Sequence, residues 1–430
     1  MGLIHTASVL ADDFDVVCLD APATPFSLDE LYKTIVEMEP FAVLIGGTSP
    51  SHPEAYGVAR TAKAAYPAAY VIKGGPHESY YPNQTALNQD IDYVISGDGE
   101  ICRSFLRELS AGRQPKQKII RGLVPSLSDQ KLPKRELLYD RNPRYYDFLG
   151  VPTAQTRTTR GCVFRCTYCS QAASFRDYSF DYIRLDLAQI AAQGFKGIYW
   201  DDALFTLKRP KVFELLKILE DMSFKMGCIT RAGINTDLEV LERMAEVGFK
   251  HIWFALESGS PEIRNTLGRK DVGVSKVKKA VDDARSVGLF PYVNAIVGSP
   301  GETDETIEET INALREIRPR GVSLSVYTCY PGMEGCDELT YENPINRDQR
   351  LMYFDEGYGG KVLVNAGRAA EWYFRMSEAV CQVGTRVIGF SDCRTPPNWE
   401  LPVEPASVQA ISDKTPMFTC EALSLTVGSG

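Results

Sequence analysis

The sequence has no run of apolar residues that approaches the ~18 needed to cross a membrane, and we expect no signal peptide at its start. Positive charge is not in excess, because 47 Lys and Arg face 56 Asp and Glu for a net charge of −9. That balance argues against a nucleic-acid-coating surface. The cysteines form no regular framework: there are 11 of them, an odd number and mostly scattered. They suit a reducing cytoplasm and not a secreted disulfide scaffold. We therefore expect a cytoplasmic protein with neither membrane nor nucleic-acid partners.

Three cysteines nevertheless lie close together in the middle of the chain. Residues 160–170 read Arg-Gly-Cys-Val-Phe-Arg-Cys-Thr-Tyr-Cys-Ser, which places Cys162, Cys166 and Cys169 within eight residues. Cysteine thiolates are the usual ligands of an iron–sulfur cluster, which normally takes four of them. Three ligands leave one iron open, and a cluster needs an open iron if it is to bind a substrate. The spacing favours such a cluster.

Two other interpretations of these cysteines stay open at this point. At spacings of four and three they would share one face of a helix, as small core residues. A zinc knuckle is the second, although a structural zinc takes four ligands and no nearby Cys or His pair completes the set. The Arg-Gly break at residues 160–161 and the strand-like alternation over residues 153–159 favour a loop over a helix.

The first hundred residues alternate between strand and helix patterns. Strands are expected at 14–19, 41–45, 69–73 and 91–96, and helices at 3–11, 27–38, 53–66 and up to 109. Ser27 and Glu30 have the spacing of a capping box at the start of the second helix. Short apolar strands alternating with helices predict a Rossmann-like parallel sheet covered on both faces. Glycines follow three of the strands, where such sheets bind ligands, although tight turns explain glycines there as well.

A second alternating unit follows a basic, proline-punctuated connector. Its strands are expected near 153–159, 196–201, 225–230, 250–257, 291–297 and 321–327, with helices near 181–193, 209–222, 237–247, 273–287 and 303–316. Six such repeats predict a partial (β/α)6 TIM-type barrel with its site at the carboxyl ends of the strands. The α/β chain then divides into a Rossmann-like domain at residues 1–111, a linker at 112–152, the barrel at 153–335 and a small C-terminal region at 336–430.

Polar residues follow the expected strands of this second unit. The cysteine loop follows the first strand, Asp201 and Asp202 the second, Arg231 the third, and Glu257 and Ser258 the fourth, while the fifth carries Asn294 and runs into Gly298 and Glu302. Because the carboxyl ends of parallel strands share one edge, these residues are expected to converge on one site. The carboxylates Asp201, Asp202 and Glu302 have a simpler explanation as helix caps, since negative charge is favoured at helix N-termini.

Together these residues resemble the radical S-adenosylmethionine (SAM) superfamily. Its signature is Cys-x-x-x-Cys-x-x-Cys with an aromatic residue before the last cysteine, which is Tyr168 here. Residues 257–259 resemble its fourth-strand Glu-Ser-Gly motif, and residues 298–302 its fifth-strand glycine motif. The resemblance covers about residues 14–335. It implies a 4Fe-4S cluster held by Cys162, Cys166 and Cys169.

The same resemblance implies a set of SAM contacts. These fall on Tyr168, Arg231, Glu257, Ser258, Asn294 and Gly298. Tyr168 would contact the adenine, and Glu257 would accept a hydrogen bond from the SAM amino group. Arg231 would pair with the SAM carboxylate, for which a guanidinium fork is suited. No catalytic residue is predicted.

The first unit resembles the cobalamin-binding-type domain at the front of many radical SAM enzymes. Gly-Gly-Pro-His at residues 74–77 and Gly-Asp-Gly-Glu at residues 97–100 carry the resemblance. Cobalamin contacts would fall on Thr48, Ser49, Gly74, Gly75 and Gly99. Two features depart from the family: one strand with its loop over the cofactor is expected to be missing before the first helix, and no histidine lies in an Asp-x-His-x-x-Gly motif.

The resemblance implies an enzyme that cleaves SAM reductively and functionalises an unactivated position of a small metabolite or peptide. Cobalamin-dependent methyl transfer is the commonest outcome in this group, and an external electron donor such as flavodoxin or ferredoxin is implied. The alternative is a cobalamin-independent enzyme with a vestigial front domain, catalysing rearrangement, cyclisation, decarboxylation or transfer of a 3-amino-3-carboxypropyl group. A third hypothesis, a non-catalytic electron carrier or cluster-binding regulator, needs neither Glu257 nor Arg231.

The region from residue 336 onward is expected to carry substrate specificity. Helical patterns lie at residues 347–354 and 366–380, the second with an aromatic run at 372–374 that favours a core role. Five loose cysteines, Cys329, Cys336, Cys381, Cys393 and Cys420, are irregularly spaced. Ordinary buried thiols are favoured over a second cluster. The final segment, rich in Pro, Ser and Thr, is expected to be a poorly ordered or surface-draped terminus.

Overall fold

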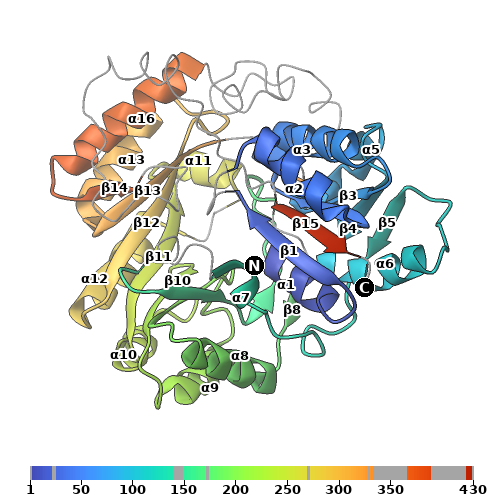
Figure 1. Cartoon of the computed structure of the whole chain (residues 1–430). Helices are drawn as coiled ribbons and strands as arrows, with labels where there is room; N and C mark the ends of the chain where they lie inside the picture. Colours follow the sequence, from blue (N-terminus) through green and yellow to red (C-terminus); the bar gives the residue numbers. More distant parts are fainter. Residues whose placement is uncertain are drawn as a thin grey trace.

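The chain folds into two mixed α/β units whose sheets lie side by side (Figure 1). The computed structural model describes residues 2–21, 26–139, 149–170, 174–268, 272–327, 330, 332–333, 366–388 and 423–428. Within these ranges, no helix is long and apolar enough to cross a membrane. The expected helix at residues 347–354 and the cysteines Cys329, Cys336, Cys393 and Cys420 lie outside the described residues.

The first sheet has the strand order β1-β15-β2-β3-β4-β5. Its strands are β1 (Asp15–Asp20), β2 (Ala42–Gly46), β3 (Tyr70–Gly74), β4 (Tyr93–Gly97), β5 (Ile119–Gly122) and β15 (Leu423–Gly428). The connecting helices are α1 (Gly2–Leu10), α2 (Leu28–Met38), η1 (Ser49–Ser51), α3 (His52–Ala65), α4 (Pro76–Tyr80), α5 (Pro82–Ala86), η2 (Gly99–Ile101) and α6 (Cys102–Ser110). Strands β2 to β4 run parallel, as predicted. Strand β5 also pairs in parallel with β4, although it lies in the segment 112–152 that was expected to be a linker.

Helices cover both faces of the first sheet, which confirms the prediction from its continuous apolar strands. Along β2, Ala42 and Leu44 face a core that includes residues of α1 and α6, and Val43 and Ile45 face a core that includes residues of α2 and α3. Successive side chains of a strand point to opposite faces, so a strand buried on both faces must be apolar throughout. The capping box at Ser27 and Glu30 starts α2 as expected.

One strand of the first sheet comes from the far end of the sequence. Strand β15, the red arrow within the blue part of Figure 1, pairs antiparallel with both β1 and β2. The expectation of a surface terminus is therefore wrong for residues 423–428, and the sheet is not parallel throughout. Apolar residues alternate with Ser and Thr in this segment, Leu-Ser-Leu-Thr-Val, which is a strand pattern.

The second sheet is seven-stranded and parallel, in the order β14-β13-β12-β11-β10-β9-β6. Its strands are β6 (Thr153–Thr156), β9 (Gly197–Trp200), β10 (Lys225–Thr230), β11 (Phe249–Glu257), β12 (Phe290–Val297), β13 (Gly321–Val326) and β14 (Arg386–Ile388). The six predicted strands are all present and lie in sequence order across the sheet. The α/β class with parallel strands is therefore confirmed.

Helices join these strands and bury a single large core. They are α7 (Glu136–Tyr139) in the connector, α8 (Phe180–Ala192), α9 (Arg209–Leu219), α10 (Leu238–Glu246), α11 (Pro261–Thr266), α12 (Val274–Ser286), α13 (Asp304–Ile317) and α16 (Ala366–Cys381). The last of these matches the helix predicted at residues 366–380. Its Trp372 is 3% exposed and lies in the core, while Tyr373 packs against that core from a half-buried position. The predicted core role of this aromatic run is confirmed for both residues.

Candidate active site

The three cysteines lie in a loop at the carboxyl edge of the second sheet. This loop, residues 161–170, leaves the two-residue strand β7 (Thr159–Arg160), and its described residues belong to no helix or strand. Strand β7 pairs antiparallel with β8 (Arg176–Asp177), which closes the base of the loop. Gly161 begins it at a φ of 77°, a backbone conformation that favours glycine. The predicted loop is confirmed, and the helix alternative is wrong.

Tyr168 and Glu257 meet at the mouth of this loop. The Tyr168 hydroxyl donates a hydrogen bond of 2.7 Å to the Glu257 carboxylate. Glu257 ends β11 at a φ of 69°, next to a shift in register between Ala255 and Glu257. A non-glycine residue held in the left-handed region costs on the order of 1–3 kcal/mol, and such residues cluster at functional sites. This strained backbone conformation directs the buried Glu257 carboxylate toward the cysteine loop.

Arg231, just beyond the end of β10, contacts the loop through its guanidinium group. That group lies over the ring of Phe164, with its Cζ atom 4.3 Å from the ring centroid, and the side chain is 2% exposed. Cation–π contacts are strongest where water is excluded. Because both loop aromatics are held by charged residues of neighbouring strands, the cysteine loop, Arg231 and Glu257 form one site, as the strand ends predicted.

Ser258 lies beside this site, but its hydroxyl pairs with Thr310 of α13 at 3.0 Å. The next residue, Gly259, allows the close approach, since a Cβ there would lie 2.4 Å from the Glu309 carbonyl oxygen. The pair fixes the end of β11 against α13. A contact of Ser258 with SAM stays a prediction.

Asn294 and Gly298 lie on and just after the adjacent strand β12. Asn294 is half-buried and opposite Ala255 of β11. The Gly298 amide donates to the Glu302 carboxylate, and the Ser299 amide does so at 2.8 Å. Burial raises the pKa of Glu302 to about 7, although the two hydrogen bonds act to lower it. Glu302 therefore closes the loop that begins at Gly298. The helix-cap explanation is wrong for this residue, because Thr303 caps α13.

Asp201 and Asp202, which follow β9, bind residues 157–159 just before the cysteine loop and do not cap a helix. Asp202, 1% exposed, accepts hydrogen bonds from the Thr158 amide and from the hydroxyls of Thr158 and Thr159. Burial raises its pKa despite these bonds. Asp201 pairs with Arg157. The cap explanation is wrong for both, because Lys208 is the N-cap of the next helix, α9. A ligand contact stays a prediction.

The residues proposed for cobalamin lie at the carboxyl ends of β2, β3 and β4. Gly75 has a φ of 137°, and a Cβ there would lie 2.5 Å from the Gly47 carbonyl oxygen. Gly74 packs closely against Ile95 of β4, and Thr48 precedes η1. Ser49 is buried, and its hydroxyl is 3.1 Å from Nδ1 of His77. These four residues share one edge; their role in cobalamin binding stays a prediction.

Gly99, the fifth of these residues, is covered by α1. A Cβ on Gly99 would lie 2.2 Å from the Thr6 hydroxyl oxygen, and helix α1 is buried along nearly its whole length. The glycine is thus explained by the close approach of a helix of the same chain.

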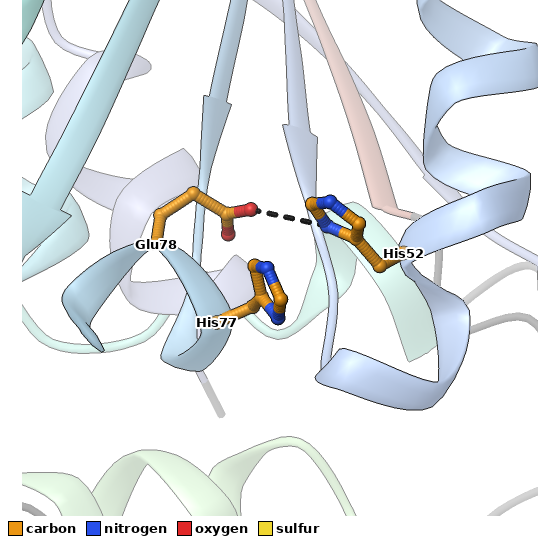
Figure 2. A group of neighbouring side chains, drawn as sticks. All are labelled: His52, His77 and Glu78. Atoms are coloured by element: carbon orange, nitrogen blue, oxygen red, sulfur yellow. Dashed lines mark ion pairs between the residues drawn. The ribbon is translucent and has the colours of Figure 1, made fainter. Parts of the chain in front are cut away.

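Behind this edge lies a buried polar network that the sequence did not reveal. Figure 2 shows His52 of α3 directed toward His77 and Glu78 of α4. Nδ1 of His52 is 3.4 Å from a Glu78 oxygen, and the two imidazole rings lie 3.8 Å apart between centroids. The Lys73 ammonium lies 2.7 Å from the same carboxylate, and neither side chain is exposed. The Lys73 ammonium already supplies a positive charge next to Glu78. We therefore interpret His52, His77, Glu78 and Lys73 as a structural network and not as a metal site.

Buried histidines make stability depend on pH. Burial lowers the pKa of His77 from 6.5 to about 3, with a contribution from His52. The unfolded chain then binds a proton that the folded one does not, so stability is complete above pH 6.5 and is lost as the pH falls toward 3. We expect His77 alone to account for a loss on the order of 2 kcal/mol by about pH 5. Urea unfolding of the cluster-free protein measures it as the difference between the wild type and a His77 variant, because burial also lowers the pKa of His5 and of His251. A His77→Gln variant should flatten this dependence, and an unchanged slope would contradict it.

The three cysteines fit an iron–sulfur cluster better than a single zinc ion. Two thiolates on one zinc, each at ~2.3 Å, lie at most ~4.6 Å apart. Among the residues that the structure describes, His52, His77 and Glu78 form the group whose ligand atoms lie within 4.8 Å of one another, and the cysteines form no such group. In a cluster each thiolate takes its own iron, so wider spacing is suitable. The zinc interpretation is therefore not supported.

Residues 156–314 match the family model described as the radical SAM superfamily. The chain carries a radical SAM domain and is an enzyme of that class, as its cysteine spacing and strand-end motifs predicted. A radical SAM domain takes a 4Fe-4S cluster and SAM, and these are the two cofactors that the match assigns to the chain.

Relatives and solved structures extend the likeness beyond that domain. An uncharacterised methyltransferase of Pyrococcus horikoshii is 28% identical over 355 residues, 77% of this chain and 76% of that protein. The anaerobic magnesium-protoporphyrin IX monomethyl ester cyclase of Rubrivivax gelatinosus is 24% identical over 76% of this chain and 63% of its own length, less than two thirds. The methyltransferase TsrM of Kitasatospora setae, with cobalamin and a [4Fe-4S] cluster bound, has a TM-score of 0.67 over 90% of this chain and 89% of its own. At 16% identity, that likeness shows the fold alone.

Proposed function

We propose that this enzyme transfers a methyl group from SAM to an unactivated position of a small metabolite or peptide, with cobalamin bound at the edge of the first sheet. One observation carries the radical SAM part of the proposal: the cysteine loop, the Glu257 carboxylate and the Arg231 guanidinium meet at one sheet edge. We place this edge in a partial (β/α)6 barrel.

The residues of the site have complementary tasks in this proposal. When bound, a 4Fe-4S cluster supplies the electron that cleaves SAM. Glu257 accepts hydrogen bonds from the ammonium group of SAM, and Arg231 pairs with its carboxylate. Charge-assisted hydrogen bonds of this kind are about twice as strong as neutral ones, so the pair fixes the orientation of the amino acid end. The buried positions of both side chains exclude water from these contacts.

The choice of methyl transfer rests on the relatives and on the first sheet. The Pyrococcus relative is named a methyltransferase, and TsrM shares the fold over most of both chains. Thr48, Ser49, Gly74 and Gly75 lie at one sheet edge, where parallel sheets bind ligands. An external flavodoxin or ferredoxin would supply the electron.

A specific contact favours the alternative, a cobalamin-independent enzyme with a vestigial first domain. Thr6 of α1 covers Gly99, one of the five residues proposed for cobalamin, and the Ser49 hydroxyl already pairs with His77. A first domain that serves only as support would show such contacts.

Binding of hydroxocobalamin distinguishes the two proposals. We expect that the anaerobically reconstituted protein retains corrinoid absorbance through gel filtration, and that S-adenosylhomocysteine release from SAM requires the corrinoid. Loss of the corrinoid together with continued reductive SAM cleavage would support the cobalamin-independent enzyme. Failure of SAM cleavage under both conditions would contradict both proposals and favour an electron carrier.

A further inference from the structure

We propose that Asp98, Glu100 and Tyr80, which lie in the loops and helices that follow the strands of the first sheet, are positioning residues for the cysteine loop, and that they hold both of its ends. The inference is independent of cobalamin, because it concerns only the contacts that this chain makes around residues 161–170. It gives the first domain a task in cluster binding whether or not it binds a cofactor of its own.

The first contact lies at the base of the loop. Arg160 and Arg176 are paired across the β7–β8 ladder, one on each side of the loop. Arg176 donates two hydrogen bonds to the Asp98 carboxylate, at 2.7 and 3.1 Å, and Arg160 lies 3.4 Å from it. One carboxylate of the first sheet therefore holds both strands that close the loop.

Glu100 strengthens the same base. It pairs with the guanidinium of Arg160, whose Nε atom also donates to the Tyr178 hydroxyl at 2.9 Å. The side chains of Asp98 and Glu100 are 10% and 4% exposed, so water does little to screen these ion pairs. Arg160 stands two residues before Cys162, which places this contact directly at the first cysteine.

The second contact lies at the other end of the loop. The Tyr80 hydroxyl, at the end of α4, donates to the Ser170 carbonyl oxygen at 2.9 Å. Ser170 directly follows Cys169. The Tyr80 ring packs in a cluster with Tyr168, and it also lies against Gly332, where a Cβ would be 2.3 Å from the ring. The first α/β unit therefore holds the loop next to both outer cysteines, through Arg160 on one side and Ser170 on the other.

These contacts matter because the loop has no regular structure of its own to restrain it. Ordering a flexible segment costs about 1–2 kcal/mol of backbone entropy for each residue, and a cluster must recover that cost when it binds. Contacts that order the loop beforehand remove part of this cost. Partners that orient metal ligands in this way typically change metal affinity or activity 10- to 100-fold when they are lost.

The test uses the full-length protein with Asp98→Asn, which keeps the shape of the side chain and removes its charge. In the cluster-free protein, we expect amide hydrogen exchange of residues 161–170 to become faster while exchange in the core of the second sheet stays unchanged. After reconstitution, we expect the iron content at limiting iron and the rate of reductive SAM cleavage to fall about 10- to 100-fold. Asp98→Glu should recover part of the loss.

Tyr80→Phe is a second variant that keeps the ring packing and removes only the hydrogen bond to Ser170. We expect a smaller effect on the same measurements, about 2- to 10-fold, as for the loss of one hydrogen bond.

Asp13→Asn and Tyr70→Phe are matched controls. Asp13 bridges Arg103 and Arg107 within the first domain, and the Tyr70 hydroxyl accepts from Gln114. Neither control should change the exchange of residues 161–170. Equal exchange and iron content in Asp98→Asn and the wild type, or equal losses in Asp13→Asn, would overturn the proposal. If methyl transfer fails while these effects persist, the proposed function is wrong and the positioning role stands.

Discussion

We expect replacement of Cys166 by alanine to abolish both the iron–sulfur absorbance of the reconstituted protein and the reductive cleavage of SAM. Cys166 is the central one of three partly exposed cysteines in the loop. Two aromatic residues anchor this loop: Phe164 packs under the Arg231 guanidinium, and Tyr168 donates a hydrogen bond to Glu257. Each thiolate of a cluster holds one iron, and this loop supplies only three. The measurements are the visible spectrum and iron content after anaerobic reconstitution, and SAM consumption with dithionite.

Cys381→Ala is the matched control for this variant. Cys381, at the end of α16, is exposed, so the prediction of a buried thiol is wrong for this residue. Its loss should leave the spectrum and the SAM cleavage unchanged. Circular dichroism should show that both variants fold. Retention of both properties by Cys166→Ala would reject the assignment of the cluster to this loop.

The second large effect concerns stability. Lys73→Met is expected to destabilise the protein by about 3–5 kcal/mol, because it leaves the Glu78 carboxylate buried without its cation. Burial acts to raise the pKa of Glu78, but Lys73 and the hydrogen bond with His52 outweigh it, so the pKa lies below its usual range. The stability from this ion pair is therefore present at neutral pH and is lost only in acid, as the pH falls through the lowered pKa. Urea unfolding of the cluster-free protein at pH 7.5 or so measures the effect.

Two further variants distinguish the loss of the buried Lys73–Glu78 ion pair from the general effect of replacing a lysine by methionine. Lys63 lies 2.7 Å from Asp92, but its side chain is 23% exposed, so Lys63→Met should cost no more than about 1 kcal/mol. The double variant Lys73→Met with Glu78→Gln should recover much of the loss, since it removes the unpaired charge. A Lys73→Met protein as stable as the wild type would show that this buried charge finds compensation elsewhere.

Local patterns were sufficient to predict the cysteine loop, the strands β1 to β4 and the second-sheet strands β6 and β9 to β13, but not β5, β14 or β15. A buried parallel strand needs a continuous apolar run, such as residues 42–45, whatever its neighbours are. The carboxyl ends of parallel strands meet at one edge, so Arg231 and Glu257 could be assigned to the site of the cysteine loop before their contacts were known. In both cases the information lies within a few residues of the chain.

The remaining features depend on partners that lie far apart in sequence. Residues 423–428 have a strand pattern, but nothing in that pattern states that the strand enters the first sheet between β1 and β2. The same holds for Asp98, whose partner Arg176 lies in the other domain. The charged residues were visible in the sequence: two arginines bound the cysteine loop, and two carboxylates lie in the Gly-Asp-Gly-Glu stretch. Their charges alone do not show that the arginines pair with these carboxylates. Ser258 likewise could not be connected with Thr310.

The position of β15 has a consequence for the order of events during synthesis. Strands β1 and β2 are translated before the second sheet, yet the strand that joins them, β15, is translated after it. Until then both present unpaired edges, which are sites for misassembly with other chains. The nascent chain must therefore carry an incomplete first sheet while the cysteine-bearing domain emerges, and only the emergence of residues 423–428 completes it.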